Sequence, residues 1–513
     1  MGDVFSNPTS SQLLLTSLRR HSKRPAITVG EQSWSYAQID EMSDRLAGFL
    51  AAQGVGPGVA VAVHLRNGCE YVVAEFAILK LAAVRVPLNE LMGVPELTYC
   101  LEHSGAKVLI TNIDLPKADR AQNRLIEVIV GLETTQPLTT KQFNWSDALA
   151  DQLSFERLTA EADDTAIIAY TGGTTGRPKG VRHTYGRMAW NLFSHINCLD
   201  IRAEEVILLT TPLPHSSGYH MVAGFLQGAH IVIEPKFDAD RFFKLCRELS
   251  VTWTMMVPTM LYRLLDHPAA GSSDHNALAT IVYGAAPINR ARLEEGLRKF
   301  GKIFLQIYGQ TECPNLITTL SKDDHTNPHL LTSCGQAVPL VELRLRPDES
   351  GAGEVEVSSP YLLTEYYKDP VITKEALGDG WLKTGDLARL ENGYLFLVDR
   401  AKDMIISGGM NVYSTEVESV LREHPGVKEA AVVGIPDPDW GEAVTAVVIA
   451  NDGSTPEAIR QFAKARLSAY KVPKSIHIIM EMPLTQYGKI DKRRVRAMMV
   501  EEMGAVLGAD AHT

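Results

Sequence analysis

The chain has few cysteines, and they lie far apart. Its 513 residues hold six, at Cys69, Cys100, Cys198, Cys246, Cys313 and Cys334. Disulfide frameworks and zinc sites place cysteines at short, paired intervals, and this sequence has no such interval. The sequence therefore predicts neither a disulfide framework nor a zinc site. Scattered, reduced thiols are typical of a cytoplasmic protein.

Two further absences narrow the range of functions. No apolar run reaches the roughly 18 residues that a membrane-spanning helix needs, so we expect no integral membrane segment. There is also no excess of positive charge, because 50 Lys and Arg stand against 61 Asp and Glu, for a formal net charge of −11. Nucleic-acid-binding proteins present a basic face. We therefore expect no nucleic-acid partner, and any bound phosphate must be held by a local cluster of groups.

Strand-like and helix-like segments alternate through most of the chain. The strand-like segments are residues 59–65, 84–88, 107–111, 165–169, 206–210, 230–233, 252–257, 280–283 and 303–307. Helical spacing occurs in residues 71–83, 185–197, 239–249 and 290–299. This alternation is typical of βαβ units in parallel sheets, where ligands bind beyond the carboxyl ends of the strands.

From about residue 340 the pattern changes to short β segments and turns. The length of the chain also indicates more than one domain. We therefore predict an α/β fold, in which residues 1–399 form a large N-terminal domain of parallel-type βαβ sheets plus a β-rich subdomain. Residues 400–513 are predicted to form a small, mobile C-terminal α+β domain, with a loosely held tail after about residue 500.

A glycine-rich stretch, residues 170–180 (YTGGTTGRPKG), follows the strand-like segment 165–169. It holds four glycines and three threonines together with Arg177 and Lys179. Glycines let main-chain N–H groups approach a ligand closely, so the stretch predicts a concave site for a phosphate. It is not the P-loop of nucleotide-binding proteins, because Lys179 is followed by Gly180 instead of Ser or Thr. A surface turn rich in Gly and Thr is the alternative.

Two later motifs also suit a nucleotide. Residues 307–312 (IYGQTE) end a strand-like run with Glu312 beside Thr311, and Mg²⁺ takes few protein ligands beside phosphate oxygens and water. Asp386, in residues 378–390 (GDGWLKTGDLARL), can accept both hydroxyls of a ribose diol. Taken singly, Glu312 could instead be an exposed loop carboxylate.

From residue 170 to residue 489 these motifs recur in an order that resembles the adenylate-forming superfamily of acyl-CoA synthetases, luciferases and peptide-synthetase adenylation domains. The sequence is most similar to a bacterial acyl-CoA synthetase of the fatty-acid or aryl-CoA ligase type. The resemblance implies an ATP-dependent carboxylic acid–CoA ligase that uses Mg²⁺, with ATP and CoA as co-substrates. It would form an acyl-adenylate and pyrophosphate, and then an acyl-CoA thioester and AMP. The alternatives are an adenylate-forming enzyme that loads a carrier protein, and a nucleotide-binding protein with a decayed site.

The resemblance also implies roles for individual residues. The catalytic residues would be Lys489, Thr311, Glu312 and His215, with Glu312 as the metal ligand. Nucleotide binding would fall to Thr171, Gly172, Gly173, Thr174, Thr175, Gly176, Lys179, Gly284, Ala285, Tyr308, Gly309, Asp386 and Arg400. CoA would lie against Ser407, Gly408 and Gly409, and the small domain would pivot at Lys402. The acyl pocket would include Gly218, Tyr219, Met221 and Val222.

The substrate class is narrowed by two positions. Amino-acid-activating relatives have an aspartate where this chain has Ser216, and an unpaired buried ammonium is costly. Residues 282–287 (VYGAAP) offer no arginine to a second carboxylate. We therefore expect a hydrophobic monocarboxylic acid, either aromatic or cyclic or a medium-chain fatty acid. The resemblance further implies a monomer or a homodimer.

Overall fold

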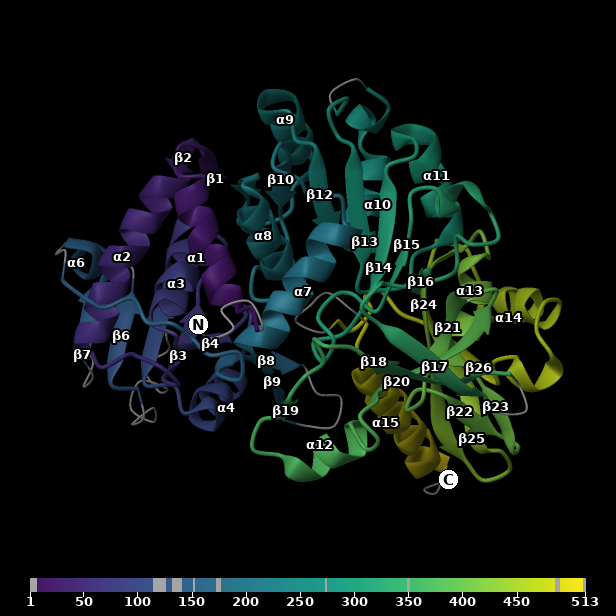
Figure 1. Cartoon of the computed structure of the whole chain (residues 1–513). Coiled ribbons are helices and arrows are strands. Elements are labelled where there is room, and N and C mark those ends of the chain that lie inside the picture. The colour runs from purple at the N-terminus through teal and green to yellow at the C-terminus, as the bar shows by residue number, and fades with distance from the viewer. Residues whose placement is uncertain are drawn as a thin grey trace. The chain divides into compact units, whose positions relative to one another are not determined.

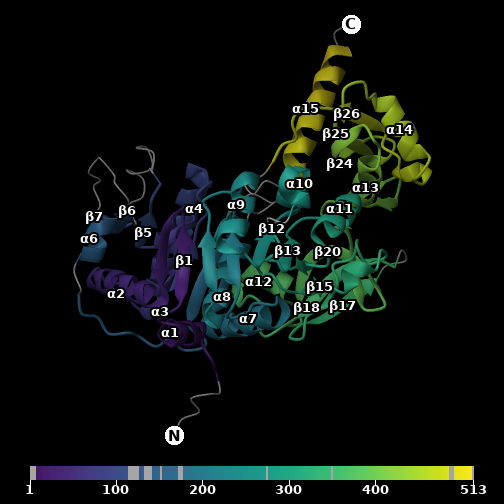
Figure 2. The same cartoon turned by 90° about the horizontal axis from the view of Figure 1, so that it is seen from above.

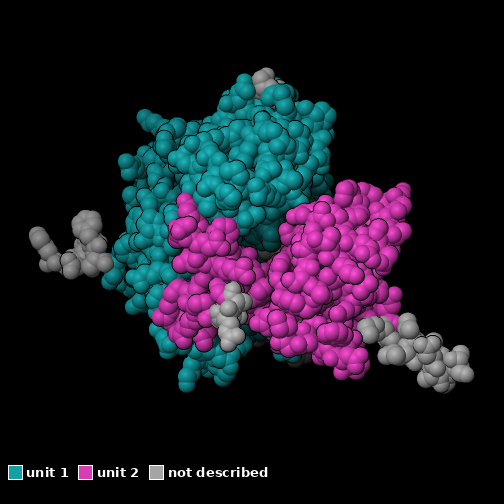
Figure 3. All heavy atoms as spheres, turned by 90° about the vertical axis from the view of Figure 1, so that its right-hand side faces the viewer, with its two compact units in different colours: residues 1–343, 357–382 teal, residues 344–356, 383–513 magenta. Residues whose placement is uncertain are grey.

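The computed structural model describes residues 7–113, 126–131, 141–150, 153–171, 177–272, 275–347, 351–484 and 490–510. The chain divides into two compact units, which Figure 3 colours separately. Unit 1 comprises Met1–Leu343 and Val357–Leu382, and unit 2 comprises Arg344–Glu356 and Lys383–Thr513. Within the described residues, no helix combines the length and apolar character needed to cross a membrane.

Unit 1 contains an eight-stranded sheet that is largely parallel (Figure 1). Its strands, in spatial order, are β19 (Glu365–Tyr366), β9 (Lys179–Thr184), β8 (Thr165–Thr171), β4 (Val84–Pro87), β3 (Ala60–His64), β5 (Val108–Thr111), β6 (Val128–Gly131) and β7 (Lys141–Asn144). The strands from β8 to β7 are parallel, whereas β9 pairs antiparallel with both β8 and β19. The glycine-rich stretch is therefore the connection of the β8–β9 hairpin.

A nine-stranded sheet forms the rest of unit 1. Its strands, in spatial order, are β16 (Gln336–Ala337), β15 (Thr318–Leu320), β14 (Phe304–Tyr308), β13 (Thr280–Gly284), β12 (Trp253–Met256), β10 (Val206–Leu209), β11 (His230–Ile233), β1 (Pro25–Val29) and β2 (Gln32–Ser35). The six strands from β14 to β1 are parallel. Strands β13 and β14 therefore end at the same edge, where sequence analysis placed a ligand site.

Helices cover the two sheets of unit 1 (Figures 1 and 2). They are α1 (Ser10–Arg20), α2 (Tyr36–Ala52), α3 (Cys69–Lys80), α4 (Val94–Ser104), α6 (Trp145–Ala150), α7 (Tyr185–Cys198), α8 (Ser216–Gln227), α9 (Ala239–Leu249), α10 (Pro258–Asp266), α11 (Arg290–Phe300) and α12 (Pro370–Ala376). Helix α3 is buried along its whole length, because its own residues are apolar on nearly every side. It packs against α1, α2, β3 and β4.

Unit 2 has two sheets. The first has the order β17 (Glu342–Pro347), β18 (Gly353–Ser358), β20 (Leu382–Glu391), β21 (Tyr394–Arg400). The second has the order β23 (Met410–Val412), β22 (Ile405–Ser407), β25 (Gly441–Ala450), β24 (Val427–Asp437), and β26 (Ser475–Ile478) pairs with β25. Helices α13 (Ser414–Arg422), α14 (Pro456–Lys464) and α15 (Lys492–Asp510) complete the unit.

The loosely held tail expected after residue 500 stays a prediction, although the chain there is helical. Helix α15 continues to Asp510, and Figure 2 shows it as one long helix. Val495 and Met499, four residues apart on one face, are buried against residues of β24 and β25. The compact units divide after Leu382, because β20 and β21 pair with each other and lie in the same sheet as β17 and β18. The predicted pivot at Lys402, within a hinge expected near residues 399–403, concerns a movement and stays a prediction.

Candidate functional site

The two stems of the glycine-rich loop are paired. Thr171, the last residue of β8, lies opposite Lys179, the first residue of β9. The predicted phosphate-binding residues between them, Gly172, Gly173, Thr174, Thr175 and Gly176, lie outside the described residues. Lys179 Nζ lies 5.1 Å from the centre of the Tyr366 ring. Strand pairing explains this contact, because Tyr366 of β19 is the register partner of Val181 in β9.

The Thr311–Glu312 motif reaches the same place from the other sheet. The hydroxyl of Tyr366 donates to Oε1 of Glu312 across 2.7 Å. Tyr366 therefore contacts both Lys179 and Glu312. Burial raises the pKa of the Tyr366 hydroxyl, and the nearby Glu312 carboxylate raises it further, so the hydroxyl is neutral and donates. A cation suited to phosphate and a carboxylate suited to a metal are thus joined by one side chain.

The backbone of the motif is held from two sides. His183 Nε2 donates to the carbonyl oxygen of Thr311 at 2.8 Å, and the N–H of Leu363 donates to the carbonyl oxygen of Glu312 at 2.7 Å. His183 is fully buried, which lowers its pKa to about 4, so its ring is neutral at physiological pH. The Thr311 and Glu312 backbone therefore has fixed partners in β9 and in the segment before β19.

The ends of β13 and β14 meet as predicted for two parallel strands. Gly284 is the register partner of Ile307, and a Cβ on Gly284 would lie 2.4 Å from the Ile307 carbonyl oxygen, so only glycine fits there. Ala285 has a φ of 66°, in the left-handed region that a residue with a Cβ rarely adopts. Gly309 is similarly constrained, because its Cβ would lie 2.3 Å from the Asn315 carbonyl carbon. Such strained, closely packed backbone is common at ligand sites.

His215 and the predicted acyl-pocket residues belong to the start of α8. His215 is the N-cap residue, and its Nε2 lies 2.8 Å from Nδ2 of Asn89. A Cβ on Gly218 would lie 2.2 Å from the carbonyl oxygen of Leu213, so this glycine is also required by packing. The other three predicted pocket residues are buried: Tyr219, Met221 and Val222. Their role in an acyl pocket stays a prediction.

Sequence analysis missed a polar cluster at the start of α8, in which His195 and His220 are buried and Ser216 and Asn315 are partly buried. Asn315 Nδ2 donates to Nε2 of His195 at 3.1 Å and to the carbonyl oxygen of Ser216 at 3.2 Å. His220 Nε2 lies 3.3 Å from Oγ of Ser216. Burial and the neighbouring His195 lower the pKa of His220 well below its ordinary value. The cluster is therefore uncharged.

In unit 2 the two predicted ribose residues are direct cross-strand partners. Asp386 of β20 lies opposite Arg400 of β21, and Arg400 Nε donates to Oδ1 of Asp386 at 3.0 Å. Asp386 is buried, whereas about half of the Arg400 side chain is exposed. The sequence predicted both residues from separate motifs, and the strand pairing brings them together.

The predicted CoA-binding segment forms a tight hairpin turn. Ser407 of β22 pairs with Met410 of β23, and Gly408 and Gly409 between them have φ values of 60° and 76°. Two central residues with positive φ are typical of a two-residue hairpin turn, so this geometry explains both glycines. Lys402 lies in the turn that follows β21. Their roles toward CoA and in the hinge stay predictions.

Lys489 lies outside the described residues. The segment that contains it is bounded by an isolated bridge between Leu484 and Ile490. Lys492, three residues further on, has structural partners instead. Its Nζ lies 2.7 Å from Oγ of Ser414 and 2.7 Å from Oε1 of the buried Glu418.

The residues of unit 1 fit the predicted metal. Glu312 supplies a carboxylate whose second oxygen and remaining lone pairs can ligate Mg²⁺, and Lys179 supplies positive charge for phosphate. Among the described residues, no group of three or more His, Cys, Asp or Glu side chains is placed to hold a metal. One carboxylate is sufficient where the nucleotide provides the other oxygens.

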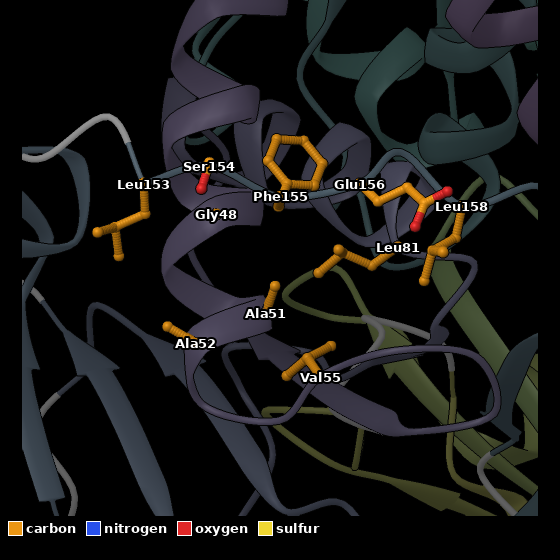
Figure 4. Close-up of a pocket in the computed structure, with 10 residues that line it drawn as sticks. All are labelled: Gly48, Ala51, Ala52, Val55, Leu81, Leu153, Ser154, Phe155, Glu156 and Leu158. Carbon is orange, nitrogen blue, oxygen red and sulfur yellow. The ribbon is translucent and has the colours of Figure 1, made fainter.

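A separate surface pocket of about 410 Å³ lies between α2 and residues 153–158 (Figure 4). Gly48 allows this close approach, since its Cβ would lie 2.4 Å from the carbonyl oxygen of Leu153. Apolar side chains such as Val55, Leu81 and Phe155 line it, and none of the predicted site residues does.

Sequence reasoning missed Tyr366 and His183 as site residues. Both lie outside the motifs, and no spacing relates Tyr366 to Glu312, which lies 54 positions earlier. His183 follows the glycine-rich stretch by three residues, whereas Tyr366 lies in a strand whose pairing with β9 the sequence does not reveal.

Comparisons with known proteins agree with this architecture. The family described as AMP-binding enzyme matches residues 14–367, and the family described as AMP-binding enzyme C-terminal domain matches residues 416–489. The chain is 36% identical to a medium/long-chain-fatty-acid–CoA ligase of Mycobacterium tuberculosis, over 99% of this chain and 93% of that protein. It is 37% identical to a feruloyl-CoA synthase of an Amycolatopsis species, over 92% of this chain and 95% of that protein.

Solved structures confirm the predicted fold class. The amide bond synthetase McbA of Marinactinospora thermotolerans superposes with a TM-score of 0.84 at 30% identity, over 96% of this chain and 99% of that chain. The o-succinylbenzoate CoA synthetase of Bacillus subtilis, solved with its acyl-adenylate intermediate, gives a TM-score of 0.85 at 28% identity, over 96% and 99%. The chain therefore belongs to the family of AMP-binding enzymes, and it is an AMP-forming acid–thiol ligase of the acyl-CoA synthetase type.

Proposed function

We propose that this enzyme joins a hydrophobic monocarboxylic acid to CoA in two steps at one site. The observation that supports this most directly is the convergence of Lys179, Glu312 and the ends of β13 and β14 in unit 1. These groups come from three separate motifs. They provide a cation, a carboxylate and a stretch of backbone that a ligand can approach closely. Together these groups suit a nucleoside triphosphate.

In the first step a carboxylate oxygen of the acid attacks the α-phosphorus of ATP. The bond to the bridging oxygen breaks, pyrophosphate leaves, and an acyl-adenylate remains. Lys179 and Thr311 hold phosphate oxygens, Glu312 would hold Mg²⁺, and Lys489 stabilises the negative charge that accumulates at phosphorus. Bound Mg²⁺ would neutralise charge on the phosphates.

In the second step the CoA sulfur attacks the acyl carbonyl carbon. The bond between that carbon and the AMP oxygen breaks, the thiol proton passes to solvent, and a thioester and AMP leave. Asp386 and Arg400 hold the ribose, and the Gly408–Gly409 turn lies against the pantetheine arm. A rotation about Lys402 exchanges Lys489 for this turn between the two steps.

The substrate class is supported by the surroundings of α8. Ser216, at the position where an aspartate would face a substrate ammonium, contacts the neutral His220. This uncharged pair cannot offset the charge of a buried ammonium, so an α-amino acid is disfavoured. The relatives named for a fatty acid and for ferulate both act on acids with a hydrophobic body, and we extend that class to this chain.

The test is the release of AMP and pyrophosphate across a panel of carboxylic acids, each with and without CoA. We expect AMP release to require one class of hydrophobic acid together with CoA. Turnover that needs a carrier-protein thiol instead would favour the carrier-loading alternative. Absence of pyrophosphate release with every acid would contradict the proposal, provided that circular dichroism shows the protein to be folded.

A further inference from the structure

We propose that Tyr366 is a positioning residue with two contacts. Its hydroxyl orients the Glu312 carboxylate for the metal of MgATP, and the face of its ring attracts the Lys179 ammonium. This inference rests on the proposed function of the site. It assigns a role to a side chain in β19, which belongs to neither the glycine-rich loop nor the Thr311–Glu312 motif.

The position of Tyr366 is set by strand pairing and burial. Strand β19 pairs antiparallel with β9, and the pair is reinforced by an ion pair between Arg182 and Glu365, whose Nη1 and Oε1 atoms are 3.0 Å apart. Only 8% of Tyr366 is exposed. Its ring is therefore a fixed part of the sheet edge, and its hydroxyl points to Glu312 Oε1 at 2.7 Å.

The hydrogen bond has a direction that suits metal binding. The Tyr366 hydroxyl is neutral, so it donates to Oε1 and leaves the second carboxylate oxygen and further lone pairs for a cation. Holding one oxygen restricts the rotation of a side chain that would otherwise sample several positions. Partners of this kind orient metal ligands, and their loss weakens metal binding without removing a ligand.

The backbone of Glu312 does not depend on Tyr366. It is held by the His183–Thr311 hydrogen bond and by the hydrogen bond from Leu363 N–H to the Glu312 carbonyl. A change at the Tyr366 hydroxyl should therefore affect the Glu312 side chain while leaving the loop in place. The ring has a second role, because Lys179 Nζ lies over its face, where a cation is attracted.

The experiment separates the hydroxyl from the ring. Tyr366→Phe removes the hydroxyl alone, and Tyr366→Leu also removes the aromatic ring that Lys179 contacts. Tyr367→Phe is the matched control, since Tyr367 is the next residue and its ring packs edge-on to His103 instead of near Glu312. Binding is measured by titration calorimetry in the absence of acid and CoA, using ATP with Mg²⁺ and ATP in EDTA.

We expect Tyr366→Phe to raise the dissociation constant of MgATP about tenfold and to leave that of metal-free ATP nearly unchanged. Tyr366→Leu should weaken both, because the support of Lys179 is lost as well. Tyr367→Phe should change neither. Thermal melting of each variant shows whether it is folded.

Equal weakening of MgATP and metal-free ATP by Tyr366→Phe, or no weakening of either, would overturn the inference while leaving the proposed function intact. A wild-type protein that binds no MgATP would instead overturn the proposed function, and the inference with it.

Discussion

At the scale of single residues, two lysines near the C-terminus have different surroundings. Lys492 contacts Ser414 and forms an ion pair with Glu418, which is only 4% exposed. Removing Lys492 would leave a buried carboxylate with less compensation, which is costly. Lys492 is therefore a structural residue of unit 2, whereas the resemblance implies a catalytic role for Lys489.

We predict that Lys489→Ala slows acyl-adenylate formation by about 100-fold or more, because it removes a cation from a phosphorus centre that gains negative charge. Thioester formation from supplied acyl-adenylate should remain near the wild-type rate. Pyrophosphate exchange measures the first half-reaction, and thioester release measures the second.

Lys492→Ala is the control for Lys489→Ala. It should lower the melting temperature and reduce both half-reactions alike, since its contacts are structural. If Lys489→Ala also reduced both half-reactions equally, the role assigned to Lys489 would be wrong.

At the scale of elements, the β22–β23 hairpin is shaped by its two glycines. Gly408 and Gly409 both have positive φ, but only Gly408 faces a neighbour, because its Cβ would lie 2.9 Å from the Trp440 ring. The N–H of Gly408 also donates to the Trp440 carbonyl oxygen at 2.7 Å. The turn is therefore fastened to the start of β25.

We predict that Gly409→Ala destabilises unit 2 by about 1–2 kcal/mol, the cost of placing a Cβ in the left-handed region. Gly408→Ala should cost more, because it must also displace the Trp440 ring. Thermal melting compares the two variants, and the thioester half-reaction shows whether the turn contributes to CoA chemistry. Melting temperatures that are the same for both would contradict the importance of the Trp440 contact.

The turn after β21 is the element in which a hinge can be tested. Lys402→Pro fixes φ at one residue of the predicted pivot. We expect adenylate formation to be largely retained and thioester formation to fall at least tenfold, if the second step needs a rotation at this residue. Separate assays of the two half-reactions decide this, and intact CoA chemistry in the variant would refute the hinge.

At the scale of the whole molecule, unit 1 encloses several uncharged histidines. Burial lowers the pKa of His64, His183 and His195 to about 4 each. In the unfolded chain the pKa of each returns to about 6.5. Between these values the unfolded state binds more protons than the folded state, so acid favours unfolding.

We therefore predict that the free energy of unfolding falls as the pH drops from about 6.5 towards 4, by about 2 kcal/mol for each such histidine at pH 5. Denaturant melts at pH 7.5, 6 and 5 measure the loss. His195→Gln, which keeps an amide near Asn315, should show a shallower loss between pH 6 and 5 than wild type. An unchanged pH dependence in this variant would contradict the assignment.

Local patterns in the sequence were sufficient to predict the α/β fold, the strand-and-helix alternation and the family. They were sufficient because apolar periodicity and glycine-rich motifs are properties of neighbouring residues. Helix α15 was missed because Val495 stands between arginines, and the buried face formed by Val495 and Met499 is recognised only from its contacts with β24 and β25.

Tertiary structure decided which of the recognised residues meet. Asp386 and Arg400 are brought together by the β20–β21 register, and Gly284 and Ile307 by the β13–β14 register. Tyr366 joins Lys179 to Glu312 only because β19 pairs with β9, although nearly 190 positions separate Lys179 from Tyr366 in the chain. Strand partners distant in sequence leave no local signal, so these contacts follow from the fold alone.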